Sequence, residues 1–170
     1  DEGIPQVVLF HSDNLEDWQY VSVLAKDLDG KLGTMWECPD FFSLNGEYGL
    51  LISPQNMMAG NEFHNGNNVA FLSGKYDKKR HIFQYDKAIS VDEGLDFYAP
   101  QTLEMPDGRR IMIGWMQSWD SNMRPENQKW SGMKSLPREL QILDGKLIQS
   151  PVKEMENYYA DTVNYTNQEI

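Results

Sequence analysis

The sequence has few residues that could form disulfides, metal sites or hydrolytic triads. Its 170 residues include one cysteine, Cys38, and three histidines. A single cysteine excludes an intrachain disulfide, and without a cysteine pair or a spaced histidine pair no zinc site is expected. The histidines have no serine or cysteine partner at a telling spacing, which argues against a hydrolytic triad. We therefore expect no metal and no cofactor.

Positive charge is also scarce. Lysine and arginine together number 15 against 26 acidic residues, so the formal net charge is -11. Such a charge repels phosphate backbones and anionic membrane surfaces, and no basic stripe offsets it. No apolar run approaches the length needed to cross a bilayer. The sequence thus predicts a soluble protein that binds neither nucleic acid nor membrane.

The sequence contains several residue pairs that are typical of tight turns. The pairs Asn45-Gly46, Asp107-Gly108 and Asp144-Gly145 favour the positive φ angles of tight hairpins, and each lies between strand-like runs. A fourth hairpin is predicted around residues 77–80. Helical periodicity is absent before Pro151, and residues 152–159 could form a short helix or a linker.

The chain is therefore predicted to be all-β. Its length and its 40% hydrophobic content suffice for one sizeable core. Hairpins without crossover helices favour a β-sandwich or a β-propeller, and the irregular turn spacing gives no count of propeller blades.

Residues 35–40, Met-Trp-Glu-Cys-Pro-Asp, carry the strongest chemical signal. Glycoside hydrolysis needs a carboxyl that stays protonated until it donates to the leaving oxygen. Trp36 as an apolar wall and Asp40 as a nearby negative charge would both disfavour ionisation of Glu37. Glu37 is thus a candidate general acid. The alternative is a strand with core aromatics and solvated acids at its end.

Two later segments add candidate sugar-binding residues. Asp96 could accept hydroxyls and Tyr98 could offer a hydroxyl and a ring face, since loops that enter the inner strands of a propeller gather at its channel. Trp115 could provide a platform for a furanose ring. The alternatives are an aspartate turn followed by packed aromatics, and tryptophan packing in the core.

Together these segments resemble the β-fructosidases of glycoside hydrolase family thirty-two, which include invertases, levanases, inulinases and sucrose-6-phosphate hydrolases. The match to that family's acid/base motif is Trp36-Glu37-Cys38-Pro39-Asp40, and three later segments match in the same order, at residues 96–101, 114–119 and 136–140. The bacterial sucrose-6-phosphate hydrolases are the most similar branch.

The resemblance implies a five-bladed β-propeller followed by a β-sandwich, and a retaining mechanism. Residues 1–150 would be the C-terminal part of the propeller, and residues 151–170 a linker or the beginning of the sandwich. By the resemblance Glu37 is the acid/base, and Trp36, Asp40, Tyr98 and Trp115 shape the fructose pocket. The expected substrates are sucrose, sucrose 6-phosphate or short fructans.

One departure from the family pattern matters. The family's nucleophile lies in a Trp-x-Asn-Asp-Pro-Asn-Gly segment and its stabilising aspartate in an Arg-Asp-Pro segment, and neither occurs here. We expect that the chain starts just after them, that the missing blades come from the rest of the natural chain, and that this fragment alone is inactive. Cys38 and the resemblance favour the bacterial cytoplasm, with secretion as the alternative.

Other functions remain open at this point. A noncatalytic carbohydrate-binding or interaction propeller would keep the aromatic pocket without the nucleophile. A fructosyl-transferring or arabinanase-like relative would share the five-bladed fold but form different products.

Overall fold

The computed structural model describes residues 3–94, 96–120, 126–161, 163 and 166, and nearly all of its regular structure is β. Ten strands and one short 3₁₀-helix are formed by the described residues. They are β1 (Gln6–His11), β2 (Gln19–Lys26), β3 (Met35–Leu44), β4 (Glu47–Gln55), β5 (Ala70–Asp77), β6 (Ile82–Ser90), β7 (Tyr98–Glu104), β8 (Arg110–Trp115), β9 (Arg138–Leu143), β10 (Lys146–Pro151) and η1 (Lys153–Tyr158). The all-β prediction is confirmed.

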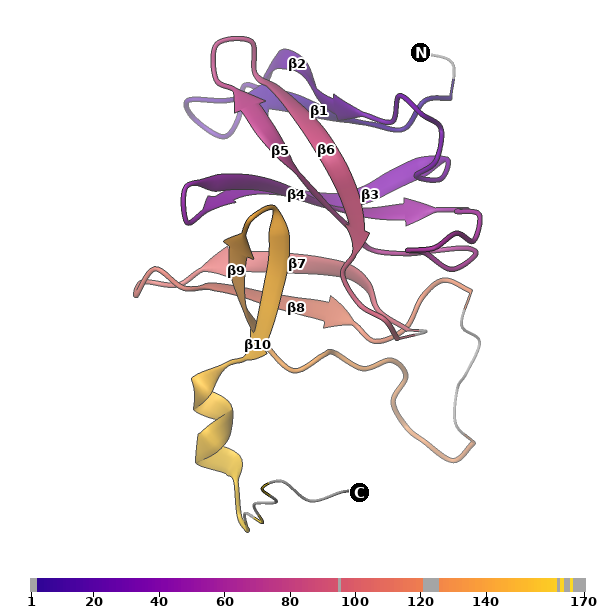
Figure 1. Ribbon diagram of the computed structural model, residues 1–170, viewed down its shortest axis with the longest axis vertical. Coiled ribbons are helices and arrows are strands. Elements are labelled where there is room, and N and C mark those ends of the chain that lie inside the picture. Colours follow the sequence, from indigo (N-terminus) through magenta and orange to yellow (C-terminus); the bar gives the residue numbers. More distant parts are fainter. Residues whose placement is uncertain (1–2, 95, 121–125, 162, 164–165, 167–170) are drawn as a thin grey trace.

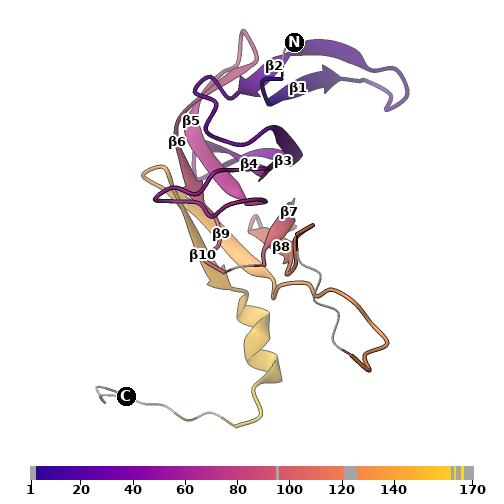
Figure 2. The same ribbon diagram turned by 90° about the vertical axis from the view of Figure 1, so that its right-hand side faces the viewer.

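The strands form three antiparallel sheets in which neighbours in the chain are neighbours in the sheet. β1 pairs with β2, β3 to β6 form a four-stranded sheet, and β7 to β10 form another. Figure 1 shows the sheets following one another from the N-terminus to the C-terminus. In the turned view, β3 and β7 lie on the inner side of an arc, whereas β6 and β10 lie on its outer side (Figure 2).

This arrangement is that of consecutive blades in a β-propeller, in which four-stranded sheets radiate from a central channel. The sheets of the described residues do not close into a ring (Figure 2). The structure therefore corresponds to part of a propeller, as the sequence predicts, and not to a sandwich.

All four predicted hairpins form, with one difference in turn geometry. Asn45-Gly46 and Asp144-Gly145 are two-residue turns in which both residues have positive φ. At Asp107-Gly108 only Gly108 does, and the connection is longer because the N–H groups of Met105 and Gly108 bond within residues 105–109. The fourth hairpin joins β5 to β6.

The apolar core lies between the sheets in two clusters. One packs β1 and β2 against one face of the β3–β6 sheet, and the other packs the opposite face against the β7–β10 sheet. The middle strand β4 serves both clusters, because Leu50 and Ile52 face the first and Leu51 faces the second. Each face of the β3–β6 sheet therefore packs against a neighbouring sheet.

The chain leaves the last sheet at Pro151. The predicted short helix forms as the 3₁₀-helix η1, which contains no buried residue. The division into a propeller part up to residue 150 and a following linker stays a prediction. In the part of the chain that the structure describes, no helix has the length and apolar character to span a membrane.

Candidate active site

The candidate active site is built on two matching irregularities in the inner strands. In β3, Glu37 pairs with Ser53 and Asp40 with Leu51, so Cys38 and Pro39 together oppose one residue of β4. In β7, Tyr98 pairs with Trp115 and Gln101 with Ile113. Each strand thus has a β-bulge in the same place.

The small residues Cys38 and Ala99 make these bulges possible. Each precedes a proline and has a φ of 48°, the left-handed region that side chains disfavour. A bulge changes the alternation of side chains along a strand, so residues three apart can face the same way. Glu37 and Asp40 consequently both reach β7, as the hydrogen bonds below show.

The Glu37 carboxylate accepts two hydrogen bonds on the same oxygen. The Tyr98 hydroxyl donates to Glu37 Oε2 at 2.9 Å, and Trp119 Nε1 donates to the same atom at 3.3 Å. The Tyr98 hydroxyl also lies 3.1 Å from the carbonyl oxygen of Ser53. Burial raises the pKa of Tyr98, and its hydrogen bond to Glu37 raises it further, so this hydroxyl stays a donor.

Three more hydrogen bonds join β3 to β7, and a fourth, from β8, reaches the same Thr102 hydroxyl. Gln101 Nε2 donates to the carbonyl oxygen of Cys38 at 3.3 Å. Asp40 Oδ2 accepts from the backbone N–H of Thr102 at 2.8 Å and from its hydroxyl at 2.7 Å. Arg110 Nη1 donates to the Thr102 hydroxyl at 2.6 Å. Asp40, predicted to bind sugar, is thus engaged in holding β3 to β7.

An aromatic wall lies beside this carboxylate. The Trp115 and Trp119 rings meet edge to face with their centroids 5.4 Å apart, and both line a cavity of about 570 Å³. Trp119 is 65% exposed, and Trp115 is half-buried. Gly132 approaches the Trp115 indole so closely that a Cβ would lie 3.0 Å from Nε1. The site therefore offers a carboxyl group next to open aromatic surface.

Trp36 lies on the other side of β3. It is 5% exposed, its indole N–H donates to the carbonyl oxygen of Leu32 at 2.9 Å, and its ring packs edge to face against Tyr85. The structure thus brings Glu37, Asp40 and Tyr98 together near Trp115, but places Trp36 in the core. Asp96 is half-buried next to buried Phe97, at the entry to β7.

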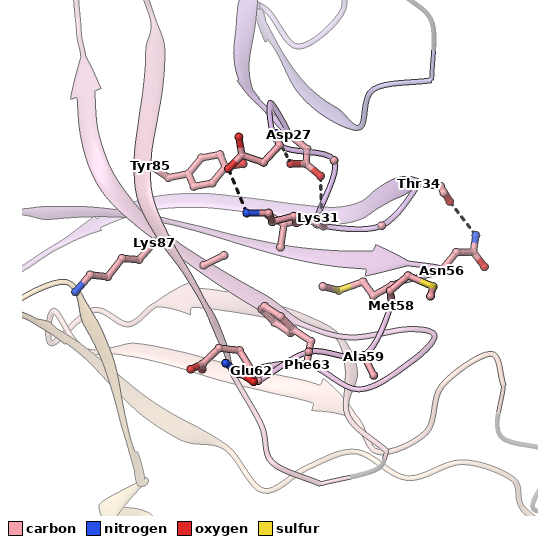
Figure 3. Close-up of a pocket in the computed structure, with 18 of the residues that line it drawn as sticks. Asp27, Lys31, Thr34, Asn56, Met58, Ala59, Glu62, Phe63, Tyr85 and Lys87 are labelled. Atoms are coloured by element: carbon pink, nitrogen blue, oxygen red, sulfur yellow. Dashed lines mark hydrogen bonds and ion pairs between the residues drawn. The ribbon is translucent and has the colours of Figure 1, made fainter.

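A larger cavity is separate from the Glu37 site. It measures about 810 Å³ and lies between the loop before β3, the loop after β4 and strand β6. Figure 3 shows Tyr85 and Lys31 on one side of it and Phe63 and Glu62 on the other. Leu32 and Tyr85, the two contacts of Trp36, belong to its lining, so the Trp36 side of β3 faces this cavity.

Sequence reasoning missed the contact between Trp119 and Glu37, because Trp115 was the preferred platform. Trp119 follows β8 in a loop whose path depends on distant contacts, including Asn67 Nδ2 to Asp120 Oδ2 at 2.7 Å. The joining of β3 to β7 was missed as well. The sequence does indicate that the two strands have the same shape, because residues 36–40 and 97–101 both read aromatic, hydrogen-bonding, small, proline, polar.

The environment of Cys38 fits an unreactive thiol. Burial raises its pKa, and the neighbouring Glu37 charge raises it further. Among the described residues no group of three histidine, cysteine or acidic side chains is placed to hold a metal ion.

Comparison with known proteins places these features in a family. Residues 1–151 match the glycosyl hydrolases family 32 N-terminal domain. The chain is 41% identical over 153 residues to a sucrose-6-phosphate hydrolase of Escherichia coli, covering 89% of this chain and 32% of that protein. It is 40% identical over 154 residues to a raffinose invertase of the same species, with the same two coverages.

Solved structures agree. A family 32 β-fructofuranosidase of Bombyx mori superposes with a TM-score of 0.87 at 34% identity, over 96% of this chain and 35% of that one. A variant of that enzyme in complex with sucrose gives 0.88 at 33% identity, with the same coverages. The chain spans about a third of the length of the relatives it matches. The chain belongs to glycosyl hydrolase family 32, and its residues 1–151 match the N-terminal domain of that family.

Proposed function

We propose that this chain carries the proton donor of a retaining β-fructofuranosidase, and that Glu37 is that donor. The observation that carries the proposal is that half-buried Glu37 accepts a hydrogen bond from Trp119, whose side chain lines the aromatic cavity with Trp115. Membership of family 32 and the similarity to sucrose-6-phosphate hydrolases support it.

In this mechanism Glu37 acts twice. In the first step it gives its proton to the glycosidic oxygen, the bond between that oxygen and the fructosyl carbon breaks, and a second carboxylate takes the fructosyl group. In the second step the Glu37 carboxylate removes a proton from water, which releases fructose and restores the acid. In retaining enzymes the two carboxyl groups lie about 5 Å apart.

The second carboxylate is proposed to come from polypeptide outside these 170 residues. Two features support this: the described sheets leave an open arc, and the relatives are about three times as long. The chain alone is then expected to be inactive, and sucrose cleavage by the purified 170-residue chain would contradict this. The natural polypeptide that contains it is the form to assay.

The proposed substrates are sucrose, sucrose 6-phosphate and short fructans. One relative is a sucrose-6-phosphate hydrolase and another a raffinose invertase, and a structural relative has been solved with sucrose bound. The aromatic surface of Trp115 and Trp119 is proposed to pack against the sugar, and Asp96, at the entry to β7, is proposed as a hydroxyl acceptor. The bacterial cytoplasm stays the predicted location.

Release of fructose from sucrose by the natural polypeptide tests the function. Glu37→Gln keeps the shape of the side chain but removes its proton, and should lower kcat by about 10²–10⁴-fold, the usual contribution of acid–base catalysis. Glu62→Gln, at an exposed position of the other cavity, is the matched control and should leave kcat unchanged.

Equal activity of Glu37→Gln and the parent would refute Glu37 as the donor. An inactive parent that still binds sucrose would instead favour a carbohydrate-binding propeller. Longer fructans among the products would favour a fructosyl transferase.

A further inference from the structure

The ring of Tyr98 is not available to a sugar. Tyr98 is 1% exposed and belongs to the core cluster between the two four-stranded sheets, with Met112 and Leu140. A stacking platform needs an open ring face, which Trp119 has and Tyr98 lacks. What Tyr98 presents to the site is its hydroxyl, through the bond to Glu37 Oε2.

The position of that hydroxyl is fixed from several directions. Its oxygen lies 2.9 Å from Glu37 Oε2 and 3.1 Å from the Ser53 carbonyl oxygen. The Tyr98 backbone lies at the start of the β7 bulge, which is bonded to the β3 bulge through Gln101 and Thr102. Tyr98 is therefore held independently of any ligand.

We infer that Tyr98 is a positioning residue that, with Trp119, holds Oε2 of Glu37 so that Oε1 carries the transferable proton. This inference rests on the proposed function of Glu37. Both donors bond to Oε2, and Oε1 accepts no hydrogen bond from the residues that the structure describes. A proton on Oε2 would compete with these two N–H and O–H donors, whereas one on Oε1 would not.

The same contact supports the reaction once the proton has left. When Glu37 has donated its proton to the leaving oxygen, its carboxylate keeps both hydrogen bonds on Oε2, so two donors already face the new negative charge. In the second step the water proton returns to Oε1. Tyr98 itself gives up no proton, which agrees with its buried hydroxyl and raised pKa.

The test uses Tyr98→Phe in the natural polypeptide with two substrates. The leaving group of sucrose is an alkoxide, which needs a proton from an acid. The leaving group of p-nitrophenyl β-fructofuranoside is p-nitrophenolate, which leaves without protonation. We expect Tyr98→Phe to lower kcat on sucrose about tenfold, the typical worth of a charge-assisted hydrogen bond, and kcat on the aryl substrate less than about twofold. Equal losses on both substrates would overturn the inference.

Tyr85→Phe is the matched control. Tyr85 is a half-buried tyrosine whose hydroxyl donates to the carbonyl oxygen of Lys26, and its ring packs against Trp36 on the far side of β3 from Glu37. The kcat of Tyr85→Phe should fall by the same factor on both substrates or not fall at all. A leaving-group dependence in Tyr85→Phe equal to that in Tyr98→Phe would also contradict the inference.

A spectroscopic readout separates the inference from the proposed function. Because Trp119 Nε1 shares Oε2 with Tyr98, its indole N–H resonance in a ¹H–¹⁵N spectrum should shift in Tyr98→Phe and stay in place in Tyr85→Phe. An unshifted resonance in Tyr98→Phe would refute the shared hydrogen bonding. If the natural polypeptide has no fructosidase activity but the Trp119 resonance still shifts in Tyr98→Phe, the contact is supported and the proposed function is refuted.

Discussion

The inner strands β3 and β7 have the same backbone shape but different chemistry. Both have a bulge with a left-handed small residue before a proline, Cys38 in one and Ala99 in the other. The residue before each bulge is Glu37 in β3, which is half-buried, and Tyr98 in β7, which is 1% exposed. The same bulge thus orients one side chain in each of the two strands.

The difference between the two strands shows how a site can form between blades. Glu37 is the proposed proton donor, and the equivalent residue of the next blade, Tyr98, donates a hydrogen bond to it. Asp40, the residue after the β3 bulge, bonds to Thr102, the second residue after the β7 bulge, and so joins the two strands. The predictions below remove these features one at a time.

The largest effect on stability is expected at Asp40. Asp40→Ala leaves the Thr102 N–H and hydroxyl without their acceptor, so the free energy of unfolding should fall by about 2 kcal/mol. Gln101→Ala, at the equivalent position after the other bulge, should cost less than about 1 kcal/mol because Gln101 is exposed. Urea unfolding measures both. Similar losses of unfolding free energy in the two variants would show that the Asp40–Thr102 contact is not the main interaction between β3 and β7.

The bulges themselves can be compared by β-branched substitutions. Cys38→Val and Ala99→Val each place a branched side chain at a φ of 48°, and each should lower the free energy of unfolding by about 1–2 kcal/mol. Cys38→Gly and Ala99→Gly are the controls, since glycine adopts this conformation freely. A large cost at one position only would contradict the equivalence of the bulges.

Alkaline pH should reveal the two tyrosines with raised pKa values, which lie on opposite sides of β3. Burial raises the pKa of Tyr85 to about 12, with further contributions from the charges of Asp27 and Asp29, and burial also raises the pKa of Tyr98. Above pH 10 the unfolded state loses these protons while the folded state keeps them. The stabilisation is therefore complete below about pH 10 and is lost as the pH rises toward 12.

Urea unfolding between pH 9 and 11.5 checks this expectation. Tyr98→Phe and Tyr85→Phe should each make the loss of stability with pH less steep than in the parent. An unchanged slope in both variants would show that neither hydroxyl titrates differently in the folded state.

The smallest effect is expected at the Cys38 thiol. Burial and then the Glu37 charge raise its pKa, so at pH 8 less of it is thiolate than in a free cysteine. Alkylation by iodoacetamide should be slower than that of free cysteine, and somewhat faster in Glu37→Gln. Alkylation as fast as in free cysteine would contradict this account of the β3 bulge.

Local features of this fold follow from the sequence, whereas contacts between blades do not. The turns at Asn45-Gly46 and Asp144-Gly145 depend on two adjacent residues each, and both form as predicted. The partners of Glu37 are far away in the chain, 61 residues for Tyr98 and 82 for Trp119. Their approach depends on how the sheets pack.

The position of Trp36 was unpredictable for a related reason. Next to Glu37 in sequence, it points to the opposite face of β3, and only the packing of β6 places Tyr85 against its ring. A motif therefore identifies the catalytic candidate, but strand alternation decides which of its neighbours share the site.

The coupling between Glu37 and Tyr98 tests the central claim most directly. The measurement is kcat on sucrose for the natural polypeptide, Glu37→Gln, Tyr98→Phe and the double variant. If Tyr98 acts through Glu37, the double variant should be no slower than Glu37→Gln alone, because Tyr98 then has no acid to position. If the two losses multiply, Tyr98 acts independently of Glu37 and the account is wrong.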